Sequence, residues 1–127
     1  MEESLGKRWG LLLDTLAQMA DPERQLVVQV HRPATFVPDE LLSNWYETFR
    51  AGQGLLRSGI SQGIVLILLD FDAHLSGLMD VVPHDTLDKE GYIRNDETWR
   101  AICELADWTL TRIVEQTVPE RPQLSPN

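Results

Sequence analysis

The residues best suited to chemistry in this chain are aspartates and histidines that follow an apolar run. The run Ile64–Leu69 leads directly into Asp70-Phe71-Asp72. Carboxylates and imidazole rings are suitable ligands for magnesium, manganese or zinc. If a hairpin follows the run, side chains from its second strand can complete the site. The candidate metal ligands are Asp70, Asp72, His74, Asp80 and His84.

The Asp-Phe-Asp sequence resembles the Asp-x-Asp motif of haloacid-dehalogenase-type phosphatases. There the first carboxylate attacks phosphate and the second acts as an acid or base. The resemblance implies a small metal-dependent hydrolase, but it covers only these residues. His74 stands where that motif has threonine or valine, and about half of the chain precedes the motif instead of a short lead-in. The alternative is an ordinary polar turn, where aspartates are common.

A second acidic segment resembles the latter half of an EF-hand calcium loop. Gly91 falls at the sixth loop position and Glu97 at the twelfth, before an expected helix. Asp88 would stand at position three, but position five is the longer Glu90 and position one is Thr86. An EF-hand also needs a helix before the loop, but the residues before this segment are predicted to form a strand. EF-hands usually occur in pairs, and the sequence has no second loop of this kind. An acidic turn that begins a helix is therefore the preferred explanation over calcium binding by Asp88, Glu90 and Glu97.

Charge and cysteine content narrow the possible functions. The formal net charge is -9, which disfavours nucleic acid and anionic membranes unless a basic patch exists, and we find no such patch. The single cysteine, Cys103, excludes an intramolecular disulfide and a cysteine-rich zinc site. The N-terminal residues lack the pattern of a secretory signal, so we expect a cytoplasmic protein.

Tryptophan spacing points to an interaction surface. In the helix expected from Asp96 to Thr117, Trp99 belongs to the apolar stripe. Trp108 lies half a turn out of phase with Trp99 at about 100° per residue, so it should point away from the core. Tryptophan beside leucine and arginine is typical of binding hot spots. The predicted interface residues are Leu105, Trp108 and Arg112. The alternative is that the N-terminal helix or the C-terminal tail covers this side of the helix.

The elements expected to position these residues follow an α-β-α-β-β-α order. Helical periodicity predicts helices at 4–20, from Pro38 to about Gly52, and at 96–117. Alternation or continuous apolar character predicts strands at 26–30, 64–69 and 78–82. We therefore expect an α+β fold: a small mixed sheet with a right-handed β-α-β unit and a hairpin, packed against helices.

The expected domain spans residues 1–118, followed by a proline-rich and disordered tail at 119–127. Two functional hypotheses remain. The preferred one is a non-enzymatic acidic interaction module, such as an inhibitor, immunity-type or chaperone-like protein, with no cofactor. Its partner would be a second copy in a homodimer or a basic protein. The alternative is a metal-binding domain or hydrolase that uses a divalent cation at the strand-end carboxylates.

Overall fold

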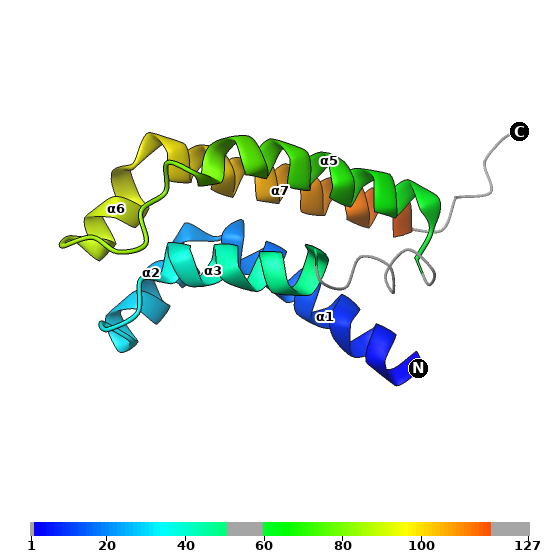
Figure 1. Ribbon diagram of the computed structural model, residues 1–127, viewed down its shortest axis with the longest axis horizontal. Coiled ribbons are helices and arrows are strands. Elements are labelled where there is room, and N and C mark those ends of the chain that lie inside the picture. Colours follow the sequence, from blue (N-terminus) through cyan, green and yellow to red (C-terminus); the bar gives the residue numbers. More distant parts are fainter. Residues whose placement is uncertain (1, 51–59, 118–127) are drawn as a thin grey trace, which may run out of the picture.

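The chain folds into two layers of helices (Figure 1). This computed structural model describes residues 2–50 and 60–117. Helices α5 (Gln62–Met79) and α7 (Glu97–Thr117) run antiparallel in one layer, over α1 (Glu2–Met19) and α3 (Val37–Trp45) in the other. The short helices α2 (Pro22–His31) and α6 (Lys89–Asn95) pack together at one end, and a π-helical turn, η1 (Tyr46–Arg50), continues α3.

The predicted α+β fold is wrong, because the described residues contain helices and turns but no strand. Residues 64–69 form the first half of α5 instead of a central strand. Buried residues recur along α5 with helical spacing at Ile64, Ile67, Leu68, Phe71 and Leu75. The six-residue apolar run hid this period because it is shorter than two helical turns. Leu66, within the run, is 56% exposed.

The predicted strand at 26–30 is also wrong, since these residues belong to α2. Asp21 caps this helix by accepting a hydrogen bond from the Arg24 amide at 3.1 Å, and Pro22 occupies its first turn. The fully buried side chains of α2 are Gln25 and Gln29, one helical turn apart. Because the buried positions are polar, the hydrophobic pattern of the sequence could not show which side faces the core.

The predicted strand at 78–82 is the third error. Leu78 and Met79 end α5, and the following residues form a turn. Val82 is nevertheless buried, because this turn folds back against the core.

Three helices confirm the periodicity from which they were predicted. In α1, Leu12, Leu16 and Met19 are completely buried. The stripe of the second predicted helix is likewise buried along α3 and η1, and so is most of the stripe of α7. Val114 of α7 is an exception, because helical spacing places it beside the buried residues but it is 55% exposed. The other buried stripe residues are Leu42, Trp45 and Phe49 in α3 and η1, and Trp99, Ile102, Cys103, Ala106 and Ile113 in α7.

Within the described residues, α5 is the one helix whose length and apolar composition would allow it to cross a membrane. Core helices of soluble proteins share these properties. One side of α5 is buried in the core, and its outer side carries Asp70 and His74. The structure is that of a small helical protein and not clearly that of a membrane protein. The predicted helix end at Gly52 and the tail at 119–127 lie outside the described residues.

Candidate functional site

The outer side of the α5–α7 layer carries a tryptophan held in place by charged neighbours. Trp108 is 54% exposed, which confirms that it points away from the core. The guanidinium carbon of Arg112, one turn later on α7, lies 4.6 Å from the centre of the Trp108 ring. Arg112 also donates a hydrogen bond to Asp70 of α5, with Nη1 and Oδ2 3.1 Å apart. An ion pair between two helices thus fixes the cation that covers one side of the indole.

Apolar side chains border this group. Leu105 lies one turn before Trp108 on α7 and packs partly against the core. Leu66 lies one turn before Asp70 on α5 and is exposed. We call the surface formed by Leu66, Asp70, Leu105, Trp108 and Arg112 the Trp108 face.

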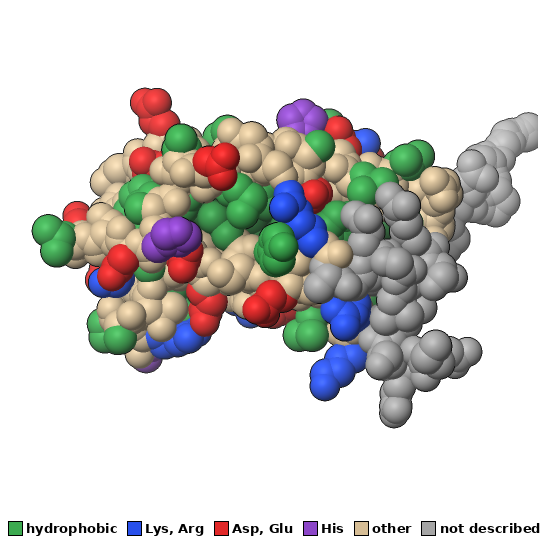
Figure 2. Space-filling model, in the orientation of Figure 1, with side chains coloured by type: hydrophobic (Ala, Val, Ile, Leu, Met, Phe, Trp, Pro, Cys, Tyr) green, Lys and Arg blue, Asp and Glu red, His purple; other side chains and the backbone are tan. Residues whose placement is uncertain are grey.

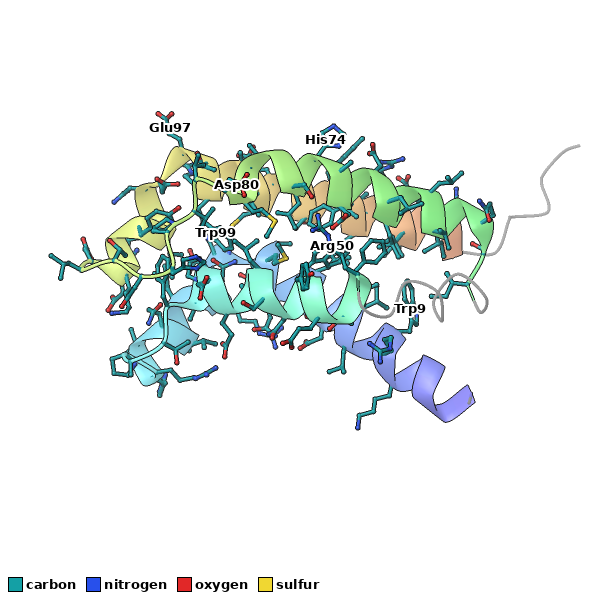
Figure 3. All side chains as sticks on the ribbon, viewed as in Figure 1. Trp9, Arg50, His74, Asp80, Glu97 and Trp99 are labelled. Carbon is teal, nitrogen blue, oxygen red and sulfur yellow. The ribbon has the colours of Figure 1, made fainter. Side chains whose placement is uncertain are left out.

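The two aspartates of the Asp-Phe-Asp sequence point to different sides of α5. Residues two positions apart are separated by about 200° around a helix, so these carboxylates cannot converge. Asp72 faces α3 and η1, where it accepts hydrogen bonds from Trp45 Nε1 at 2.9 Å and Arg50 Nε at 3.1 Å. Arg50 also donates to the Ser76 hydroxyl. Figure 3 shows Arg50 between the two helical layers, whereas His74 projects outward from α5.

The remaining candidate metal ligands are dispersed. His74 Nδ1 lies 3.5 Å from Oδ1 of Asp70, but Asp80 stands at the far end of α5 (Figure 3). His84 pairs with Asp39 of α3, Nδ1 to Oδ1 2.8 Å. Across residues 2–50 and 60–117, no group of three or more histidine, cysteine, aspartate or glutamate side chains could hold a metal ion. The predicted convergence depended on a hairpin, and the helix in its place separates these residues.

The calcium-like segment is helical where the motif requires a loop. Asp88 caps α6 by accepting a hydrogen bond from the Gly91 amide at 2.9 Å. A side chain at position 91 would collide with the Asp88 carboxylate, so Gly91 makes room for this cap. Glu90 is exposed on α6, and Glu97 projects from the start of α7 (Figure 3). The preferred interpretation, an acidic helix start, matches this geometry.

A fully buried polar cluster joins the two layers. Gln25 of α2 accepts a hydrogen bond from Trp99 Nε1 at 2.8 Å and donates to the Met19 carbonyl at 3.1 Å. Its Nε2 also lies 3.7 Å from the sulfur of Cys103. Burial raises the pKa of the Cys103 thiol to about 11, so the thiol stays protonated and unreactive near neutral pH. Cys103 is therefore a core residue.

Sequence analysis missed Arg50, Tyr46 and Gln25 as organising residues. Arg50 and Tyr46 lie in the π-helical turn, which breaks the α-helical period used to assign faces. Only the buried position of Gln25 shows its importance, and a glutamine that directly precedes the predicted strand at 26–30 gives no such signal. Leu105, Trp108 and Arg112 were found from helical phase, but the pairing of Arg112 with Asp70 is a tertiary contact.

Comparisons of the chain with protein families, curated proteins and solved structures found no match. The case for function therefore depends on the geometry of the described surfaces.

Proposed function

We propose that this chain is a non-enzymatic, acidic interaction protein of the cytoplasm that binds a protein partner through the Trp108 face. The observation that carries the proposal is the held, half-exposed indole of Trp108, with Arg112 stacked on it and paired to Asp70. Tryptophan and arginine dominate binding hot spots. A side chain already ordered before binding loses less conformational entropy when the complex forms.

The simplest partner is a second copy of the chain. A twofold interface places the same surface on both sides, so that surface must be complementary to itself. The Trp108 face meets this requirement because it combines apolar Leu66 and Trp108 with one acid, Asp70, and one base, Arg112. Two such faces can bury their apolar side chains together and exchange ion pairs. Inhibitor, immunity-type and chaperone-like activities are all compatible with this mode of binding.

Sedimentation velocity over a concentration series tests the proposal. We expect the wild-type mass to rise from 14.5 kDa toward twice that value. Trp108→Ser should weaken the association by about thirtyfold or more, the effect expected of a hot-spot residue. Val81→Ser is the matched control, because Val81 is 67% exposed but belongs to the turn after α5. Equal association of the two variants would contradict the proposal.

A wild-type chain that stays monomeric would exclude the homodimer. The same two variants then decide whether the face binds a different protein. A specific partner captured from lysate must be lost with Trp108→Ser and retained with Val81→Ser. Retention by both variants would remove the Trp108 face from consideration.

A further inference from the structure

A second surface, separate from the Trp108 face, is a groove between α3, η1 and the C-terminal end of α5. Its cavity measures about 230 Å³. Figure 2 looks onto this side of the molecule, where hydrophobic side chains gather between the two helical layers, with acidic, basic and histidine side chains around them. We call it the α3–α5 groove. It is lined by Asp39, Leu42, Ser43, Tyr46, Glu47, Met79, Val82 and His84.

The floor of the groove is apolar and belongs to the core. Leu42 and Val82 are 6% and 7% exposed, and Met79 packs against the same cluster. These side chains are held by the core, so the depression exists before any ligand arrives. Tyr46 is 52% exposed and forms a wall, held by Arg50, whose guanidinium carbon lies 5.5 Å from the ring centre. Together they offer a preformed apolar slot.

The edge of the groove is negatively charged. Asp39 bonds through its Oδ1 to His84 Nδ1, 2.8 Å away. Glu47 forms no ion pair with any other described residue. Arg50, whose guanidinium lies over the Tyr46 ring, is paired with Asp72. With a net charge of -9 on the whole chain, this edge repels anionic ligands and attracts cations.

The size of the cavity favours one inserted side chain over a whole small molecule. Pockets for drug-sized ligands measure about 300–1,000 Å³, more than this groove provides. One leucine or methionine side chain is small enough to fill the slot. Basic residues beside it in a peptide would then reach the carboxylates at the edge.

We propose that the α3–α5 groove binds a basic peptide segment of a partner protein, with one leucine- or methionine-sized side chain inserted between Tyr46 and Met79. Lysine or arginine residues on either side of the inserted residue pair with Asp39 and Glu47. The apolar contact provides the fit, and the charges select basic segments and speed association. This proposal goes beyond the Trp108 face and does not depend on it.

The test uses the full chain and a synthetic peptide with one leucine between two pairs of lysines. Two matched peptides carry alanine for the leucine, or glutamates for the lysines. Chemical-shift mapping by NMR should place the largest changes at Tyr46, Glu47 and Met79. Both matched peptides should bind at least about fivefold more weakly, since each lacks one of the two contributions.

Charge reversal on the protein provides the second arm. Glu47→Lys should weaken binding of the leucine–lysine peptide by about tenfold, because it removes an attraction and adds a repulsion. Glu115→Lys, an equally exposed acid on α7, is the control for net charge and should change the affinity less than twofold, that is, by about 0.4 kcal/mol or less. Both substitutions are on the surface, so folding is retained. Trp108→Ser should leave peptide binding unchanged, which separates this proposal from the interface proposed above.

Three results would overturn the proposal. One is the absence of shifts at up to about 1 mM peptide, where even a weak complex is populated. Another is equal weakening by Glu47→Lys and Glu115→Lys, which would show attraction to overall acidity only. The third is equal binding of the leucine and alanine peptides, which would show that the slot is not occupied.

Discussion

Asp70 and Asp72 lie two residues apart on α5, yet they belong to two different polar clusters. Asp72 faces the interior, where its side chain is 17% exposed and accepts hydrogen bonds from Trp45 and Arg50. Asp70 faces outward, is 43% exposed, and holds Arg112 against Trp108. The inner cluster connects two layers of helices, whereas the outer cluster arranges a surface. Helix geometry alone therefore divides one acidic motif between the interior and the surface.

The largest expected effect comes from breaking the inner cluster. Asp72→Ala leaves the Trp45 indole N–H, in a residue only 1% exposed, without its acceptor and removes the partner of Arg50. We expect the free energy of unfolding to fall by about 3 kcal/mol, with a lower Tm by about 10 °C. Urea unfolding followed by circular dichroism measures this loss.

The matched variant Asp70→Ala tests the other side of the same helix. Its ion pair with Arg112 is only partly buried, so we expect a loss of no more than about 1 kcal/mol. Similar losses from the two variants would contradict the division between an inner structural acid and an outer surface acid.

The helices with a regular spacing of apolar residues could be predicted from sequence. In α1 and α7 the apolar residues recur at helical spacing over several turns, which also placed Trp108 outside the core. Asp21 and Ser61 cap α2 and α5 in the structure, but the strands at 26–30 and 64–69 were predicted from short-range alternation and from the apolar run. A short apolar segment is compatible with either a buried strand or a helix, so local pattern could not decide.

The candidate sites were less predictable because they depend on packing between distant segments. Arg112 and Asp70 are 42 positions apart, and His84 and Asp39 are 45 apart. No local spacing indicates these pairs. The predicted metal site assumed a hairpin after residues 64–69. Because these residues form a helix, the candidate ligands do not converge. Because Tyr46 and Arg50 lie in a π-helical turn, their side chains do not point in the directions expected from α-helical spacing.

A third polar cluster, which contains Cys103, is fully buried. Its contribution to the free energy of unfolding depends on pH. The pKa of Cys103 is raised by burial from 9.0 to about 11 in the folded protein. As pH rises through this interval, the unfolded thiol loses its proton before the folded one does. The stability contribution is therefore present below pH 9.0 and is lost as pH rises toward about 11. We expect a decrease of at most about 3 kcal/mol.

Urea unfolding between about pH 8 and pH 11 measures this decrease. Cys103→Ala should show a flatter dependence, whatever its absolute stability. Tyr92, whose pKa burial raises to about 12, is present in both proteins and cancels from the difference. Parallel pH profiles for the two proteins would show that Cys103 is not the responsible group.

The smallest expected effect lies at the outer cluster, where the role of Asp70 is to position Arg112. Asp70→Asn keeps the shape of the side chain but removes the charge that fixes the guanidinium over Trp108. We expect association through the Trp108 face to weaken by about threefold at low salt, far less than with Trp108→Ser. At about 1 M salt, where charges are screened within about 3 Å, the difference from wild type should nearly vanish. Sedimentation at both salt concentrations measures it. A loss as large as that of Trp108→Ser, or one that persists in high salt, would mean that Asp70 contacts the partner directly instead of positioning Arg112.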